Sequence, residues 1–228
     1  MNSYLIVVAH PDDEVLGAGA IISKYSKSGC KVDVCILCSS VEAREKRPSS
    51  EQFKLDIQSA LSSLGVNKIF LGDFPNIALN TVSHLALVQF IENAIISTSP
   101  DVLITHHPSD LNNDHYITSI TCQAASRLYQ RRPDIHPLSE LLYMEVLSSS
   151  DWALNPSVRQ FSPNIFVEIG EKGIEDKISA LSSYQGVMRD YPHSRSVQTI
   201  KALATYRGSQ VGVMYAEAFE LGFKVFRD

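Results

Sequence analysis

The sequence has little of what a disulfide-stabilised or nucleic-acid-binding protein needs. Only four of its 228 residues are cysteines, and three of these, Cys30, Cys35 and Cys38, lie in or beside one predicted strand, where they are poorly placed to pair with each other. The formal net charge is -5, and there is no long lysine or arginine run. Duplex nucleic acid and anionic membrane surfaces, which need clustered positive charge, are therefore not expected partners. A small neutral or cationic molecule is the expected ligand instead.

Long hydrophobic segments are also absent. No stretch approaches the roughly eighteen successive apolar residues that a membrane span requires. The chain enters a strand-like apolar run by Tyr4, so a basic region followed by a cleavable apolar helix is missing as well. We therefore expect a cytoplasmic protein without a membrane span and with reduced cysteines. The sequence does not decide between a monomer and a homo-oligomer.

Short apolar segments rich in β-branched residues alternate with longer segments of helical spacing. This alternation predicts an α/β fold, namely a Rossmann-like three-layer α/β/α domain with a mainly parallel sheet. No linker rich in proline, glycine or serine interrupts the chain, so residues 1–228 are predicted to form a single domain. Strands are predicted at 3–10, 31–40, 67–72, 101–107, 140–146, 164–169 and 217–226, and helices at 14–28, 50–64, 81–97, 114–130, 171–184 and 194–206.

Two loops carry the residues that could bind a metal or take part in catalysis. The first predicted strand ends in Ala9-His10-Pro11-Asp12-Asp13-Glu14, and the fourth ends in His106-His107 and runs on to Asp114-His115. With a strand order of 3-2-1-4-5, strands one and four are neighbours and both loops face each other at the ligand-binding edge of the sheet. Two imidazoles and a carboxylate on facing loops suit a divalent metal with an open position, and a spare carboxylate beside them could serve as a base. The alternative is that the acidic run only caps a helix.

The AHPDDE segment together with the later Asp114-His115 pair resembles the LmbE/PIG-L family of zinc-dependent N-deacetylases. The resemblance covers nearly the whole chain, because the tail at 207–210 and 215–219 is similar to bacterial members. It implies that His10, Asp13 and His115 bind Zn²⁺ and that Asp12 is the general base. It also implies a small-molecule substrate, an N-acetylated sugar or sugar conjugate of the N-acetylglucosamine type, from which acetate is removed.

Substrate-binding candidates lie at the same edge of the sheet. Many family members have a histidine at the position of Asn112, and an amide can donate a hydrogen bond to an oxyanion but cannot supply a proton. The sequence is similar here to a bacterial subgroup with Asp-Leu-Asn before the Asp-His pair. Arg44 follows the second strand and could hold a hydroxyl or phosphate group, although a solvated charge explains it equally well. Asn76 follows the third strand, and its role is open.

Other residues have simpler expected roles. Of the adjacent His106 and His107, at most one is expected to face the pocket. His193 is expected in a solvated region that caps a helix, with closure over the site as the alternative. Cys35 and Cys38 are expected in the core on opposite faces of a strand. Close packing of a helix on the sheet explains Gly17-Ala18-Gly19, which lacks the third glycine of a dinucleotide loop.

Two alternatives to a zinc hydrolase remain at this stage. Two histidines and a carboxylate also bind Fe²⁺, either as the metal of the deacetylase or in a non-haem iron oxygenase. The spare Asp12 argues against an oxygenase. A sugar-binding or assembly protein with a retained metal pocket and weak turnover is the second alternative, because of Asn112.

Overall fold

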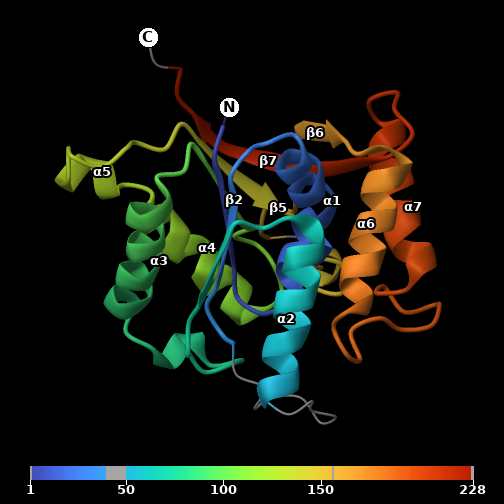
Figure 1. Ribbon diagram of the computed structural model, residues 1–228, viewed down its shortest axis with the longest axis horizontal. Coiled ribbons are helices and arrows are strands. Elements are labelled where there is room, and N and C mark those ends of the chain that lie inside the picture. Colours follow the sequence, from blue (N-terminus) through green and yellow to red (C-terminus); the bar gives the residue numbers. More distant parts are fainter. Residues whose placement is uncertain (1, 40–49, 156, 227–228) are drawn as a thin grey trace.

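The computed structural model describes residues 2–39, 50–155 and 157–226, and strands and helices alternate along them (Figure 1). The strands are β1 (Tyr4–Val8), β2 (Val32–Ile36), β3 (Lys68–Leu71), β4 (Val102–His106), β5 (Glu140–Met144), β6 (Ile165–Glu168) and β7 (Ala216–Lys224). The helices are α1 (Asp13–Lys27), α2 (Ser50–Leu64), α3 (His84–Thr98), α4 (Asn113–Ala125), α5 (Leu128–Arg131), α6 (Gly170–Ser182) and α7 (Val197–Ser209), with 3-10 turns at Leu79–Thr81 and Ser150–Trp152.

These strands form one sheet in the order β3-β2-β1-β4-β5-β7-β6. Strands β1 to β5 are parallel to one another, whereas β7 runs antiparallel to both β5 and β6. The predicted mainly parallel sheet is therefore confirmed, and the first five strands have the 3-2-1-4-5 order that was assumed for them. Because β1 and β4 are adjacent and parallel, the segments that follow them leave the sheet at the same edge.

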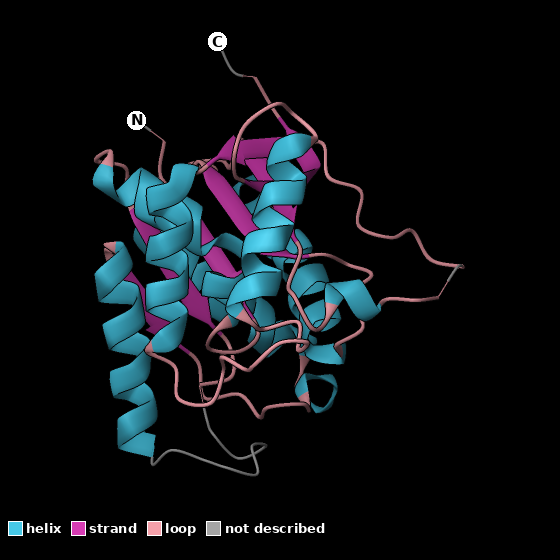
Figure 2. Cartoon of the chain, turned by 90° about the vertical axis from the view of Figure 1, so that its right-hand side faces the viewer, coloured by secondary structure: helices cyan, strands magenta, loops and turns pink. Residues whose placement is uncertain are grey.

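Helices cover both faces of the sheet. Within β1, Leu5 and Val7 belong to a buried cluster with α3 and α4, whereas Ile6 and Val8 belong to a second cluster with α1, α2, α6 and α7. Successive side chains of a strand point to opposite faces, so β1 is buried on both sides. The two helical layers flank the sheet in Figure 1, and Figure 2 faces the α6 and α7 side. The predicted three-layer α/β/α arrangement is confirmed.

The predicted helix at 114–130 is wrong in extent, because the structure has two helices there. Helix α4 ends at Ala125, and α5 begins at Leu128 after a turn. The Ser126 hydroxyl donates to the Gln123 carbonyl at 2.9 Å, a local bond that competes with continuation of the helix. Among the described residues, no helix combines the length and apolar character needed to cross a bilayer.

The cysteines Cys35 and Cys38 are buried as predicted, but they do not lie on opposite faces. Both belong to the cluster that packs against α3 and α4. Strand β2 ends at Ile36, so its alternation of side chains does not extend to Cys38. Burial raises the pKa of both thiols, which leaves them as protonated core groups.

Helix α1 lies close against β5 at Gly17. A Cβ atom at this position would lie 2.3 Å from Met144 Sδ, so a larger residue here would force the Met144 side chain to move. The expected packing role of Gly17 is confirmed. This close approach sets the position of the helix whose first turn carries the acidic residues.

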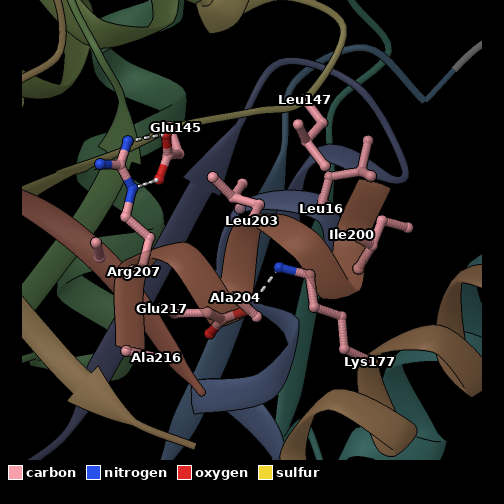
Figure 3. A pocket seen from close by; sticks show the side chains of 12 residues that line it. Leu16, Glu145, Leu147, Lys177, Ile200, Leu203, Ala204, Arg207, Ala216 and Glu217 are labelled. Carbon is pink, nitrogen blue, oxygen red and sulfur yellow. Dashed lines mark hydrogen bonds and ion pairs between the residues drawn. The ribbon is translucent and has the colours of Figure 1, made fainter. Parts of the chain in front are cut away.

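Helix α1 is also tied to the C-terminal part of the chain through Glu217 of β7. The backbone amides of Ala20 and Ile21 donate to the Glu217 carboxylate at 3.0 and 2.8 Å. The Lys177 amine of α6 donates to the same carboxylate at 2.7 Å (Figure 3). A buried carboxylate needs such partners, and here they join β7, α6 and α1.

Candidate metal centre

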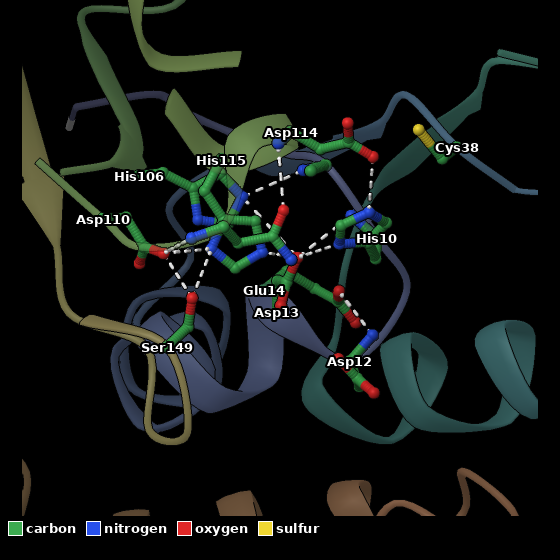
Figure 4. A network of polar contacts seen from close by, with 12 residues as sticks. His10, Asp12, Asp13, Glu14, Cys38, His106, Asp110, Asp114, His115 and Ser149 are labelled. Carbon is green, nitrogen blue, oxygen red and sulfur yellow. Dashed lines mark hydrogen bonds and ion pairs between the residues drawn. The ribbon is translucent and has the colours of Figure 1, made fainter. Parts of the chain in front are cut away.

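Three buried side chains from the two motif loops converge at the carboxyl ends of β1 and β4 (Figure 4). Asp13 Oδ2 lies 3.3 Å from His10 Nδ1 and 3.1 Å from His115 Nε2. One potential ligand atom from each of the three residues lies within 4.8 Å of the others. Two imidazole nitrogens and a carboxylate oxygen at this spacing could hold Zn²⁺ or Fe²⁺.

Each of these histidines contacts a second carboxylate through its other ring nitrogen. His10 Nε2 lies 3.0 Å from Asp114 Oδ2, and His115 Nδ1 lies 3.2 Å from Asp110 Oδ1. Such contacts set the ring orientation and tautomer of a metal-binding histidine. They leave His10 Nδ1 and His115 Nε2 directed toward Asp13, which is the arrangement that a shared metal ion requires.

The two outer carboxylates are themselves fixed by donors. Asp114 accepts hydrogen bonds from the backbone amides of Ile77, at 2.6 Å, and Leu79, at 3.0 Å. Asp110 accepts a bond from the Ser150 hydroxyl at 2.7 Å and another from the Ser149 hydroxyl. The orientation of both histidines therefore depends on loops that follow β3 and β5.

Imidazoles and carboxylates in this cluster shift the pKa of one another. Burial would lower the pKa of His115, but Asp13 and Asp110 outweigh burial and raise it to about 10. Burial would raise the pKa of Asp13 and Asp110, but the histidines outweigh burial. They hold the pKa of Asp13 well below its usual range and that of Asp110 at about 2. Without a metal, His115 carries a proton, which a bound metal ion would displace.

Asp12 lies beside the cluster and differs from Asp13 in its contacts. It is the N-cap residue of α1 with φ 99°, and its side chain makes no capping hydrogen bond. Asp12 is only 1% exposed. Its carboxylate pairs with Arg195, whose Nη1 lies 3.2 Å from Asp12 Oδ2. Helix capping therefore does not account for this carboxylate.

Glu14 is buried and contacts the backbone of Asp12. Burial raises the pKa of Glu14 to about 8. The Tyr184 hydroxyl donates to its carboxyl group, and the Asp12 backbone amide donates to it at 3.1 Å. Glu14 thus fixes the backbone amide of Asp12, and its contact with Tyr184 connects this turn to the segment that follows α6.

A cavity of about 360 Å³ opens above the cluster. Asn112 is the N-cap residue of α4, and its Oδ1 accepts the Asp114 amide at 2.9 Å, which leaves the NH₂ group as the available donor. Asn76 Oδ1 is buried and has no hydrogen-bond partner among the described residues. Arg44 lies outside the described residues. The cavity is lined by His10, Asp12, Asp13 and His115 together with Asn76, Asn112 and Arg195.

Neither His106 nor His107 is among the described residues that line this cavity. His106 accepts the Ala9 amide through Nε2 at 2.9 Å and stacks on His115 with ring centroids 3.8 Å apart. Burial lowers the pKa of His106 to about 3, so it is a neutral support for His115. His107 instead faces Glu220, at 3.4 Å. His193 is exposed, as expected.

Asp110 and Arg195 are site residues that the sequence patterns did not single out. Asp110 had a detectable signal, since it is an acid in the same loop as His115. Arg195 had no such signal in the sequence, because it is 183 positions from Asp12. No periodicity or spacing connects two such distant residues.

The chain matches a known family over the part that carries both motif loops. The model of the family described as "PIG-L: GlcNAc-PI de-N-acetylase" matches residues 5–126, more than half of the chain. The chain belongs to the PIG-L family. The predicted resemblance is confirmed, and Arg195 lies outside the matched part of this PIG-L family protein.

Solved structures share the fold over nearly the whole chain. A conserved protein from Thermus thermophilus has a TM-score of 0.79 and 22% identity, with 100% of this chain and 98% of that chain covered. The N,N'-diacetylchitobiose deacetylase from Pyrococcus horikoshii has a TM-score of 0.78 and 18% identity, covering 96% and 83%. GalB, the 4-carboxy-2-hydroxymuconate hydratase from Pseudomonas putida, has a TM-score of 0.76 and 18% identity, covering 100% and 99%. At these identities the likeness concerns the fold.

Proposed function

We propose that this PIG-L family protein is a metal-dependent hydrolase that removes the acetyl group from an N-acetylated amino sugar of the N-acetylglucosamine type. The observation that carries the proposal is the convergence of His10, Asp13 and His115 beside a second buried aspartate, Asp12, at one cavity. Three ligands leave room for water or substrate, and a separate carboxylate is what amide hydrolysis needs as a base. The family membership supports the same reaction.

The donor set fits a metal, with His10 Nδ1, an Asp13 oxygen and His115 Nε2 as the ligand atoms. The opposite ring nitrogens are held by Asp114 and Asp110, as is usual for histidines that bind zinc. Zn²⁺ is the proposed cofactor, and Fe²⁺ suits the same donors. When bound, such an ion polarises a carbonyl group and lowers the pKa of water.

Asp12 is the proposed general base. It faces the same cavity as the three ligands without belonging to the group that they form, so its carboxylate can take a proton from the attacking water. The same carboxyl group can then return this proton to the nitrogen as the amide bond breaks, which yields acetate and a free amine. This reuse explains how a chain with Asn112 in place of a histidine could complete the reaction.

The proposed substrate contacts come from Asn76, Asn112 and Arg44. The available Asn112 amide donor suits the oxygen of the tetrahedral intermediate, and the unpartnered Asn76 oxygen suits a sugar hydroxyl. Arg44 stays a prediction from the sequence alone. We also propose that residues 1–228 act as one domain in the cytoplasm.

Acetate release tests the proposed reaction. Protein loaded with Zn²⁺ is incubated with a panel of N-acetylated amino sugars and their conjugates, and acetate and free amine are measured. Equal amounts of both products are expected from at least one compound. No acetate from any member, with one metal ion bound per chain, would favour the sugar-binding alternative.

Two neighbouring aspartates provide the matched test of the assigned roles. Asp12→Asn should keep the metal and lose turnover by about a hundredfold or more, as is typical for loss of a general base. Asp13→Ala should lose metal affinity first. Metal content by elemental analysis and kcat for acetate release separate the two effects, and the reverse result would show that the roles are exchanged.

A further inference from the structure

Arg195 and Asp12 form an ion pair in the wall of the cavity. Arg195 Nη1 lies 3.2 Å from Asp12 Oδ2, and both residues line the cavity. The arginine side chain is 26% exposed, while the aspartate side chain is 2% exposed. A carboxylate removed from water to this degree needs a charged or hydrogen-bonding partner, and Arg195 provides one from a distant part of the chain.

Arg195 is fixed at both its side chain and its backbone. Its Nε donates to the Ser148 hydroxyl at 2.8 Å. The backbone amide of Arg195 donates to His193 Nδ1 at 3.0 Å, and its carbonyl accepts the Arg189 amide at 3.2 Å. The next residue, Ser196, is the buried N-cap of α7. The guanidinium group is therefore held in place rather than moving freely above the cavity.

Asp12 is available for this contact because of its backbone. A non-glycine residue at φ 99° is in a sparsely populated region that persists only when surrounding contacts enforce it. The Glu14 carboxyl group holds the Asp12 amide, and the Asp12 side chain is not used as a helix cap. Its carboxylate is thereby turned toward the cavity, where Arg195 meets one oxygen.

We propose that Arg195 is a positioning residue for Asp12, which it holds in the orientation required for proton transfer. The proposal rests on the proposed function, in which Asp12 is the base. Two different nitrogen atoms of Arg195 contact Ser148 and Asp12, and a lysine has only one nitrogen to offer. The C-terminal segment, outside the matched family region, thus completes the site by orienting a residue of the N-terminal motif.

Kinetics of Arg195→Gln test the positioning role. We expect kcat for acetate release to fall about tenfold or more, with KM changed less than about threefold and metal content unchanged. Arg195→Lys should recover only part of kcat, and added guanidinium ion should recover part of the activity of Arg195→Ala. Arg189→Gln is the matched control, because Arg189 is an exposed arginine of the same segment, and it should behave as wild type.

Several kinetic outcomes would overturn the proposal. If Arg195→Gln keeps kcat within about twofold of wild type, Asp12 does not need this partner. A rise in KM alone would make Arg195 a substrate contact, and a loss of metal would make it a structural support for the ligands. Arg195→Lys is measured alongside in case Arg195→Gln does not fold.

A double-mutant cycle tests the pair without any activity. Unfolding equilibria are measured for wild type, Asp12→Asn, Arg195→Gln and the double variant. Effects that depart from additivity by about fivefold or more in the unfolding constant are expected for groups in direct contact, and additive effects would overturn the pairing. If wild-type protein releases no acetate but the cycle shows coupling, the proposed function fails while the Asp12–Arg195 pairing stands.

Discussion

The N-terminal part of the chain, residues 2–126, and the C-terminal part, residues 127–226, contribute differently to the candidate site. The first part contains His10, Asp13 and His115 and is the part that the family model matches. The second part supplies Ser149, which donates to Asp110, and Arg195, which pairs with Asp12. Groups that could bind a metal come from one part, and several of the contacts that orient them come from the other.

This difference follows from the sheet. His10 and His115 follow β1 and β4, which are neighbours, so their loops meet wherever a parallel sheet of this order forms. Arg195 and Glu217 belong to segments far along the chain, and their contacts with Asp12 and α1 depend on how β7 and the last helices pack. Substitutions in the first part should therefore change metal binding. Substitutions in the second part should change the orientation of site residues or the stability of the protein.

The largest effect is expected at the ligand histidines. His10→Ala or His115→Ala should remove most metal binding, because each takes away one of the three proposed ligands. Elemental analysis after dialysis against Zn²⁺ measures this loss. His136→Ala is the control from the C-terminal part, since His136 is exposed and pairs with Asp101 away from the site, and it should keep both the metal and kcat. If metal uptake is unchanged in both variants, the N-terminal part does not supply the metal ligands as proposed.

A smaller effect on metal binding is expected at Asp110. Asp110→Asn removes the charge that orients His115, and loss of such a partner weakens metal affinity by about 10–100-fold. A competition titration with a chelating dye measures the affinity. Asp134→Asn is the matched control, because Asp134 is an exposed aspartate paired with Arg132 at the surface. Equal affinities for wild type and Asp110→Asn would show that the loop, rather than this contact, positions the histidine.

Glu217 should affect stability rather than metal binding. Glu217→Gln leaves the buried Lys177 amine without its counter-charge, which costs about 3–5 kcal/mol in the free energy of unfolding. Denaturant unfolding measures the loss, and replacing Lys177 by Met in the same protein should recover part of it. Glu171→Gln, at an exposed position in the first turn of α6, should cost less than about 1 kcal/mol, through the helix dipole alone. A change in metal affinity larger than the change in stability would place Glu217 among the site residues.

The smallest effect is expected at the opposite edge of the sheet, where Asp101 precedes β4. Asp101 accepts bonds from the Ser3 amide at 2.7 Å and from its hydroxyl at 2.9 Å, and it pairs with His136. Burial acts to raise the pKa of Asp101, but these contacts outweigh it and lower the pKa below 3.8.

Because the folded pKa is the lower one, the stabilisation by Asp101 is present above pH 3.8 and is lost as the pH falls through the folded value. Asp101→Asn should reduce the free energy of unfolding by about 1 kcal/mol at neutral pH. The difference from wild type should shrink in acid, as measured by unfolding at several pH values. Kinetics and metal content should not change, since the residue is far from the strand ends that carry the site.

Much of the fold was predictable because it depends on local pattern. The short β-branched segments and the helical spacing predicted β1 to β5 and most helices, including α2 at the residues where the structure has it. The predictions that failed did so because of local details of the backbone. Ser126 bonds to its own turn and separates α4 from α5, and the early end of β2 places Cys38 on the same side as Cys35.

The amino-acid sequence by itself predicted the α/β class, because the spacing of apolar residues suffices for it, and it predicted that the loops after β1 and β4 meet only with the strand order of a doubly wound sheet assumed. Only the tertiary structure decided which imidazole nitrogens face Asp13, that Asp12 pairs with Arg195, and that His106 supports His115 while His107 turns to Glu220. These depend on hydrogen bonds between segments as many as 183 positions apart, and such contacts exist only once both layers of helices have closed on the sheet.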